Sequence, residues 1–141
     1  MGDAAGAAGA ASAENGELAA FAGRIRACAP DLAVATLRLN PDGLTNHVLI
    51  VDDTWVFRFP KDDYARDLLA REAQTLAVAR SRVDLAVPDF AACGSDGVRY
   101  RLLPGRPLYR HDLLRQDEAT QARIAGQLGH FLRQLHAIPP A

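Results

Sequence analysis

Residues 40–72 read N-P-D-G-L-T-N-H-V-L-I-V-D-D-T-W-V-F-R-F-P-K-D-D-Y-A-R-D-L-L-A-R-E, and this stretch decides the fold. Two runs rich in β-branched and aromatic residues, 48–51 and 55–59, flank an Asp-Asp turn. Pro60 ends the second run because proline cannot continue to donate to a strand ladder. The pattern predicts a loop, a β-hairpin and then a helix.

A cation lies in the middle of the second predicted strand. Side chains alternate between the two faces of a strand, so Arg58 shares a face with Val56 while the aromatic residues take the other face. In the helix that follows, Glu72 falls inside an apolar stripe, four residues after Leu68. An unpaired carboxylate against a core is costly, so we expect Glu72 to pair with Arg58. Lys61, just beyond the strand, is expected to be a solvated charge.

The loop before the hairpin contains Gly43, Thr45 and Asn46. Backbone N–H groups in a tight glycine-containing turn can converge on phosphate oxygens, and the side chains of Thr45 and Asn46 add donors. The alternative is an ordinary connection between strands. The position of the loop directly before the Arg58 strand favours a phosphate site.

The rest of the chain predicts an α+β fold. β-Propensity and turn residues predict further strands at residues 34–39, from 87–90 onward, and at 98–103, which complete a five-stranded, mostly antiparallel sheet with one packed helix. Helical periodicity followed by proline predicts helices at residues 16–29 and 116–137. Residues 1–15 are rich in Ala and Gly, and we expect them to be disordered.

Composition narrows the partners. The chain has 141 residues, of which 49% are hydrophobic and 23% charged, enough for one core. A formal net charge of −1 argues against nucleic acid or an anionic membrane as a partner. Cys28 and Cys93 have no C-x-x-C spacing, so neither a zinc site nor a disulfide framework is expected, which fits a cytoplasmic location.

A glycine loop, a hairpin, a strand cation and a helix glutamate occur in this order where protein-kinase-like folds bind ATP phosphates. The residues resemble the aminoglycoside phosphotransferase family over positions 34–139. The matching segments are residues 43–46 for the phosphate loop, 56–60 for the cation strand, 71–72 for the helix glutamate, 100–108 for the hinge and 128–139 for the first helix after the hinge.

The resemblance implies a division of the chain into a tail at 1–15, a nucleotide-binding small lobe at 16–103, and the hinge exit with the first helix of a truncated large lobe at 104–141. It also implies ATP or GTP with Mg2+ as the nucleotide. The implied nucleotide-binding residues are Thr45, Asn46, Arg58, Glu72 and the hinge backbone of Arg101, Leu102 and Leu103. A strand followed by an ordinary turn is the alternative interpretation of the hinge.

Phosphoryl transfer also needs a catalytic aspartate and further metal ligands, which the family writes as H-x-D-x-x-x-x-N and a later Asp. The sequence contains no such string and no asparagine after Asn46, so it predicts neither a catalytic nor a metal residue. We expect the nucleotide-binding N-terminal part of a small-molecule kinase, of a family linked to antibiotic resistance, whose acceptor binds only if a C-terminal lobe exists. The alternatives are a non-catalytic binding module, which would dimerise through its C-terminal helix, and a decayed gene fragment.

Overall fold

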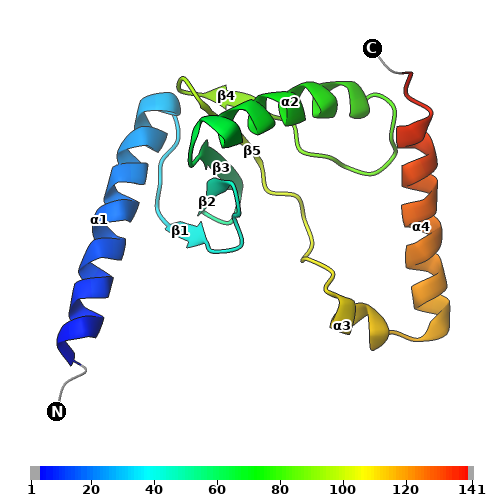
Figure 1. Cartoon of the computed structure of the whole chain (residues 1–141), viewed down its shortest axis with the longest axis horizontal. Coiled ribbons are helices and arrows are strands. Elements are labelled where there is room, and N and C mark those ends of the chain that lie inside the picture. The colour runs from blue at the N-terminus through cyan, green and yellow to red at the C-terminus, as the bar shows by residue number, and fades with distance from the viewer. Residues whose placement is uncertain (1–3, 140–141) are drawn as a thin grey trace. The chain divides into compact units, whose positions relative to one another are not determined.

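The computed structural model describes the backbone of residues 4–139 and the side chains of residues 15–139. Contacts divide the chain into two compact units, one built from residues up to Arg71 with Phe90–Leu102, the other from Glu72–Asp89 with the residues from Leu103 onward. The elements, in chain order, are α1 (Ala4–Cys28), β1 (Leu37–Asn40), β2 (Asn46–Val51), β3 (Trp55–Pro60), α2 (Asp63–Ala79), β4 (Ala91–Cys93), β5 (Gly97–Arg101), α3 (Arg110–Leu114) and α4 (Glu118–His136) (Figure 1).

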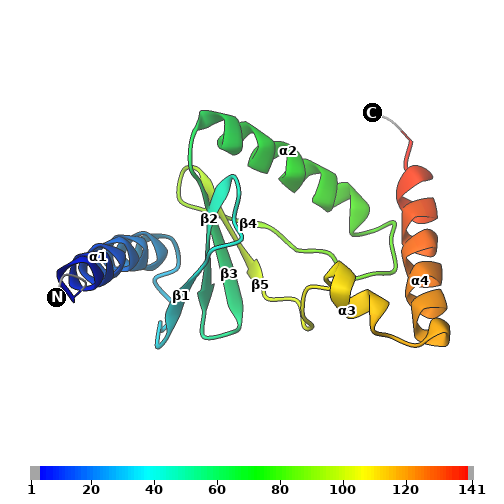
Figure 2. The same ribbon diagram turned by 60° about the horizontal axis from the view of Figure 1, so that its bottom comes forward.

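The first unit contains a five-stranded sheet in the order β1-β2-β3-β5-β4 (Figure 2). All four strand pairings are antiparallel, so the α+β fold with a mostly antiparallel sheet is confirmed. The third strand in this order is β3, which pairs with β2 on one side and with β5 on the other. The strand that carries Arg58 is therefore the middle of the sheet.

The predicted Asp-Asp turn joins β2 to β3. Asp52 and Asp53 have positive φ angles of 50° and 45°, which aspartate adopts more readily than most residues because its short side chain can bond locally. The N–H of Thr54 closes the turn by donating to the carbonyl oxygen of Val51 at 2.9 Å.

The same turn fastens the segment that enters β1. A carboxylate oxygen of Asp52 accepts hydrogen bonds from the N–H groups of Thr36 at 2.6 Å and Ala35 at 3.2 Å. These bonds, that of Thr36 foremost, hold the pKa of the Asp52 carboxyl below its usual value. The hairpin and the edge strand are thus joined by an ionised carboxylate.

One face of the sheet forms the main core with α1. The buried side chains of this core are Phe21, Ile25 and Ala29 from α1 and its C-terminal end, Leu49 and Val51 from β2, Phe57 and Phe59 from β3, and Cys93 from β4. The rings of Phe21 and Phe59 stack with their centroids 5.7 Å apart. On the opposite face, Ile50 and Val56 are also buried, as alternation requires.

The first helix differs from the sequence-based expectation at its start. It begins at Ala4, whereas the periodicity predicted a helix from residue 16 after a disordered stretch. Alanine has the highest helix propensity, so an Ala-rich segment can continue a helix without a periodic apolar pattern. Residues 1–3 of the expected tail lie outside the described part of the chain.

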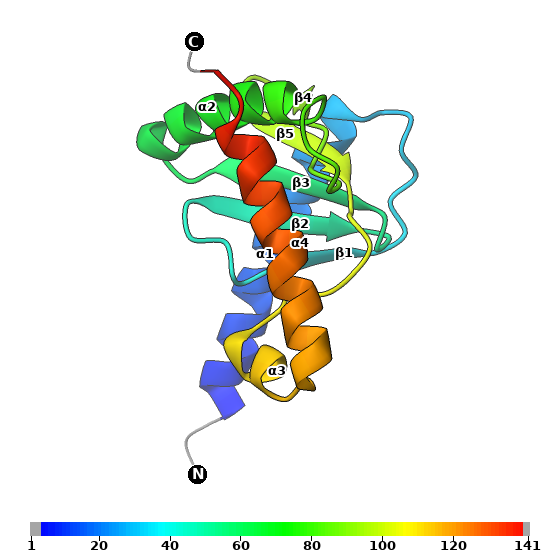
Figure 3. The same cartoon turned by 90° about the vertical axis from the view of Figure 1, so that its right-hand side faces the viewer.

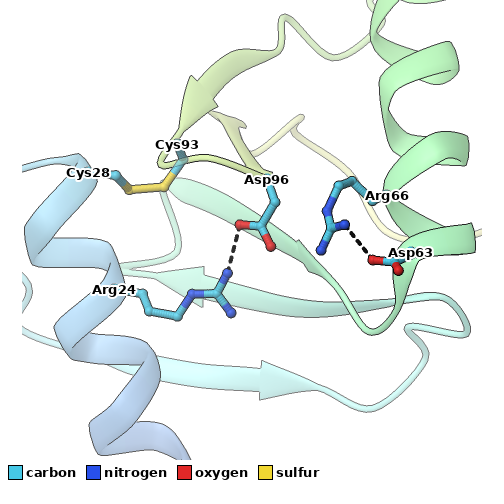
Figure 4. Close-up of polar contacts among 6 residues, drawn as sticks. All are labelled: Arg24, Cys28, Asp63, Arg66, Cys93 and Asp96. Atoms are coloured by element: carbon cyan, nitrogen blue, oxygen red, sulfur yellow. Dashed lines mark hydrogen bonds and ion pairs between the residues drawn. A yellow bond between two sulfur atoms is a disulfide. The ribbon is translucent and has the colours of Figure 1, made fainter.

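The expectation of no disulfide is wrong. Cys28, at the end of α1, is bonded to Cys93, at the end of β4, with a Cα–Cα distance of 5.0 Å (Figure 4). The two residues are 65 positions apart, so no local spacing reveals the pair. Only the docking of α1 against the β4 end of the sheet brings them together.

The second unit contains α3, which leads into α4 (Figure 3). Asp117 caps α4 by accepting a hydrogen bond from the N–H of Thr120 at 2.7 Å, and this bond lowers the pKa of the Asp117 carboxyl. The predicted helix at 116–137 is confirmed, whereas α3 is too short to show a periodicity. No side chain of α4 is buried, and Leu128 and Leu132 on its apolar stripe are 53% and 40% exposed.

A polar contact ties the loop before β4 to α4 within this unit. Nε2 of His130 lies 2.9 Å from a carboxylate oxygen of Asp84, and the Asp84 N–H donates to the side-chain oxygen of Gln134 at 3.0 Å. The side-chain bonds from His130 and Gln134 lower the pKa of the Asp84 carboxyl. Among the residues that the structure describes, no helix is long and apolar enough to cross a bilayer.

Replacing Gly97 with Ala should destabilise the first unit. A Cβ at this position would lie 2.6 Å from the ring of Phe59 and 2.8 Å from the carbonyl oxygen of Cys93. Overpacking of this kind costs about 1–3 kcal/mol, which urea denaturation of Gly97→Ala will measure. The matched control is Gly23→Ala on the exposed side of α1, where nothing lies within 4 Å and alanine should stabilise by about 0.5–1 kcal/mol. An unchanged unfolding midpoint for Gly97→Ala would contradict the described packing of β5 against Phe59.

Candidate functional site

A cavity of about 310 Å³ opens beside the loop that joins β1 to β2. Its lining combines this loop with side chains from three strands of the first unit. The lining residues are Asp42, Gly43, Leu44, Thr45, Asn46, Val48, Arg58 and Tyr100.

Strand register explains why these strand residues share one cavity. Val48 of β2 lies directly opposite Arg58 of β3, and Val56 of β3 lies opposite Tyr100 of β5. Residues opposite one another in an antiparallel pair point to the same face, as do residues two apart on one strand. Asn46, two positions before Val48, joins the same face. The cavity therefore lies on the sheet face opposite the core with α1.

Arg58 is half-buried and has an aromatic neighbour. Its guanidinium carbon lies 5.5 Å from the centroid of the Phe90 ring, a cation–π distance. Phe90 in turn packs against Tyr100, with ring centroids 5.1 Å apart. Arg58 is thus partly buried beside the Phe90 ring, so its charge is less screened than that of a fully solvated guanidinium.

Lys61 is exposed, as expected of a solvated charge, and it also holds the loop. Its ammonium donates to the carbonyl oxygens of Gly43 at 2.6 Å and Leu44 at 3.2 Å. Its backbone N–H donates to the carbonyl oxygen of Thr45 at 3.1 Å. In a trans peptide the N–H points opposite to the C=O. The N–H groups of Leu44 and Thr45 therefore point away from Lys61, as an anion-binding turn requires.

Gly43 is needed because the loop folds closely on itself. A Cβ at this position would lie 2.3 Å from the backbone oxygen of Asn46 and 3.0 Å from a methyl group of Val48. Backbone cannot move aside as the end of a flexible side chain can. Any side chain at position 43 would thus open the turn.

Asn46 carries an unsatisfied buried atom. The residue is 4% exposed, and its amide nitrogen donates to the hydroxyl oxygen of Thr45 at 3.0 Å. Its Oδ1 has no hydrogen-bond partner among the residues that the structure describes. Exchanging the amide oxygen and nitrogen would let Thr45 donate instead and leave the NH₂ group without a partner. In either orientation, one polar atom of Asn46 remains for a ligand or a water molecule.

The structure brings three of the predicted residues together. Thr45, Asn46 and Arg58 all line the cavity. Glu72 is half-buried on α2, in the unit that does not contain Arg58, and the Arg58–Glu72 ion pair stays a prediction.

The predicted hinge residues divide into different roles. The side chain of Arg101 lies over the Trp55 ring at 4.2 Å, so only its backbone could serve the site. The N–H of Leu102 donates to the carbonyl oxygen of Thr54 at 2.8 Å and is therefore already used. Leu103 belongs to the second unit, and its role stays a prediction.

The backbone N–H and C=O groups of Arg101 point to the side of β5 that faces away from β3. Residues of a strand alternate in the direction of their N–H and C=O groups, so if Leu102 faces β3, Arg101 faces away from it. The described pairing of β4 with β5 begins at Ala91 opposite Arg99, two residues before Arg101. The backbone N–H and C=O groups of Arg101 are therefore oriented so that a ligand at this edge of β5 can hydrogen-bond to them.

The sequence did not indicate the contributions of Tyr100 and Phe90 or the bonds of Lys61 to the loop. Alternation along β5 could have placed Tyr100 on the Arg58 face, but the contacts of Phe90 and Lys61 depend on loop geometry. Within the described residues, no three His, Cys, Asp or Glu side chains lie close enough to hold a metal ion.

The sheet, its loop and its central cation define a protein-kinase-like small lobe. Residues 36–141, more than half of the chain, match the phosphotransferase enzyme family. The chain therefore belongs to this family. A comparison with curated proteins gives no match.

Solved structures agree with this assignment. The chain is similar to aminoglycoside 2'-phosphotransferase-IIIa in its GDP complex, with 27% identity, a TM-score of 0.79 and coverage of 86% of this chain and 42% of that chain. It is also similar to the GDP and kanamycin complex of APH(2")-IIia, with 27% identity, a TM-score of 0.78 and coverage of 84% and 42%. It is also similar to macrolide 2'-phosphotransferase MphH from Brachybacterium faecium, with 28% identity, a TM-score of 0.60 and coverage of 79% of this chain and 41% of that chain. The chain thus spans less than half the length of these relatives.

Removing the Lys61 ammonium should loosen the loop without unfolding the chain. In Lys61→Met, losing the bonds to Gly43 and Leu44 should cost about 1 kcal/mol locally. It should speed amide exchange about fivefold at Asp42, whose N–H is bonded to the Asn40 side chain, and at position 61, whose N–H is bonded to the Thr45 carbonyl oxygen. Hydrogen exchange followed by NMR measures this. The control is Arg66→Met, which removes an exposed cation paired with Asp63 (Figure 4) and should leave the loop amides unchanged. Equal loop exchange rates in Lys61→Met and in the parent chain would rule out the clamp.

Proposed function

We propose that this chain is the nucleotide-binding, N-terminal part of a small-molecule kinase that transfers the terminal phosphoryl group of ATP or GTP, bound with Mg2+, to a hydroxyl group. The observation that carries the proposal is the single cavity shared by the Gly43 loop, Thr45, Asn46 and Arg58. This cavity offers backbone donors, a hydroxyl, an unsatisfied amide and a cation. These are the groups that bind phosphate oxygens.

Arg58 would provide the main charge for the phosphates. A guanidinium is permanently charged and can bridge two oxyanions, and here it is partly buried beside the Phe90 ring. The loop would contribute the N–H groups of Leu44 and Thr45, which Lys61 orients. Glu72 would hold Arg58 in place through the predicted ion pair.

The purine would lie against the end of β5. The backbone of Arg101 is oriented away from β3 and is suited to hydrogen-bond a purine edge, with Leu103 as the next group of the same orientation if the extended backbone continues. The N–H of Leu102, already bonded to Thr54, would take no part. The site prediction is thereby refined to the backbone of Arg101 and Leu103, with the side chain of Leu102 left for apolar contact.

The described residues include no cluster of three His, Cys, Asp or Glu side chains for a metal ion, and the sequence lacks the H-x-D-x-x-x-x-N string that would supply the catalytic aspartate and a Mg2+ ligand. We propose that both come from a segment outside this sequence, since the chain spans about 42% of similar phosphotransferases. That segment would also select the acceptor, for which the similar structures suggest an aminoglycoside or macrolide antibiotic. The enzyme would act in the cytoplasm, where ATP and GTP are available.

A second candidate function is a protein-interaction module. The exposed stripe on α4, with Leu128 and Leu132, favours it. Concentration-dependent dimerisation in sedimentation experiments, without saturable nucleotide binding, would select this candidate.

Replacing Arg58 with Ala should weaken nucleotide binding at least about tenfold, because a hydrogen bond to a charged group contributes about 1.5–3 kcal/mol. Isothermal titration with MgADP measures the change. The control is Arg38→Ala, which removes an exposed arginine of β1 paired with Asp53 at 2.8 Å and should not affect binding. Absence of saturable binding by the parent chain, or an equal loss in Arg38→Ala, would overturn the proposal.

The Arg58–Glu72 ion pair can be tested separately from the nucleotide. A double-mutant cycle with Arg58→Met and Glu72→Gln, measured by urea unfolding, should give a coupling energy of about 0.5–2 kcal/mol. Both side chains are half-buried, so we expect less than the cost of breaking a fully buried pair. Additive single effects, with coupling near zero, would remove the pair from the mechanism.

A further inference from the structure

The disulfide between Cys28 and Cys93 connects two elements that no strand pairing joins. It links the last residue of α1 to the last residue of β4. The 65-residue separation encloses the candidate phosphate loop and Arg58. A bond in this position holds α1 at one end while the side chains of the helix pack along the sheet.

The helix that this bond holds lies on the back of the Arg58 strand. Phe59, the next residue of β3, stacks on Phe21 of α1 at 5.7 Å and lies under the guanidinium of Arg24 at 4.0 Å. Arg24 also donates to a carboxylate oxygen of Asp96 at 3.0 Å, beside the disulfide (Figure 4). Loss of α1 would therefore expose the aromatic face of the strand whose other face carries Arg58.

The disulfide borders a cavity, and of its two cysteines only Cys28 is partly exposed. A second cavity, of about 200 Å³, is lined by both cysteines together with Arg24, Ala27, Phe59 and the turn residues Gly94, Ser95 and Asp96. Cys93 is fully buried, whereas Cys28 is half-buried. A small thiol in this cavity would approach the bond from the Cys28 side, next to the ion pair of Arg24 with Asp96.

We propose that Cys28 and Cys93 form a reversible redox modification site at which small thiols exchange with the disulfide and release α1 from the sheet. A thiolate attacks one sulfur, the Cys28–Cys93 bond breaks, a mixed disulfide forms and the other cysteine leaves as a thiolate. A second small thiol then attacks the mixed disulfide. Two electrons pass to the protein, the small thiols leave as their disulfide, and both cysteines end as protonated thiols.

Reversibility is also expected from the cell compartment. Disulfides in cytoplasmic proteins are rare and are mostly transient, catalytic or redox-sensing. The assumption of a cytoplasmic location is the one part of this proposal that rests on the proposed function, since a kinase that uses cellular ATP or GTP works in that compartment. The geometric steps rest on the helix, the strand and the cavity.

The first experiment equilibrates the chain in buffers with graded ratios of reduced to oxidised glutathione, then blocks free thiols with N-ethylmaleimide and measures the intact mass. We expect one transition between a doubly labelled chain and an unlabelled monomer with an internal disulfide. A chain that stays doubly labelled at every ratio, or that pairs only between molecules, overturns the proposal.

The second experiment compares amide hydrogen exchange in the two redox forms. Amides of α1 at residues 21–28 should exchange at least about tenfold faster in the dithiol form, while those of β2 and β3 change less. Equal exchange of α1 in both forms, or the same acceleration in the sheet, overturns the release of the helix.

The control variant is Cys28→Ser, since its half-buried position tolerates serine better than the fully buried Cys93. It should exchange like the reduced parent chain at every glutathione ratio. Neither readout uses a nucleotide. Failure of MgADP to bind would therefore count against the proposed kinase function but not against the redox site. Failure of thiol exchange would count against the redox site but not against the kinase function.

Discussion

The two faces of β3 are the constraint on which the rest of the structure depends. Phe57 and Phe59 are 0% and 1% exposed on the face that packs against α1, and Arg58 between them is directed to the cavity on the other face. A slip of one residue in register would place Arg58 in the apolar core and the aromatic rings in the cavity. The same packing that buries the rings therefore fixes the direction of the cation. Both the burial of the aromatic core and the direction of Arg58 toward the cavity follow from the alternation of side chains along β3.

The loop beside Arg58 obtains its shape from backbone geometry. Gly43 allows the close approach of the chain to Asn46, and Lys61 draws two loop carbonyl groups toward its ammonium. Lys61 follows directly after β3, so the strand that presents Arg58 also positions the residue that orients the loop. The two parts of the cavity are thus coupled through a few residues of chain, which keeps their relative geometry constant without a large interface.

Local chemistry made much of the fold predictable. Alternation gave the strands around the Asp52-Asp53 turn and the side on which Arg58 lies, and the proline signals gave the ends of the helices. Long-range contacts were not readable, because the bond between Cys28 and Cys93 and the clamp by Lys61 depend on where distant segments meet. The use of the Leu102 N–H by Thr54 depends on a strand register that no composition reveals. The shared cavity of Thr45, Asn46 and Arg58 could be anticipated because these residues lie on adjacent elements of one hairpin and its loop.

The similar structures separate the two halves of the proposed activity. Proteins named for an aminoglycoside and for a macrolide are similar to 86% and 79% of this chain, with TM-scores of 0.79 and 0.60. Under the proposed function, a part of the chain similar to proteins named for such different acceptors would bind what their reactions have in common, which is the phosphoryl donor. A site built from backbone groups and one arginine places few demands on the sequence, which agrees with identities of only 27% and 28%. Under the proposed function, binding of the nucleotide and choice of the acceptor therefore reside in different parts of the protein, and only the first is encoded by the sheet around β3.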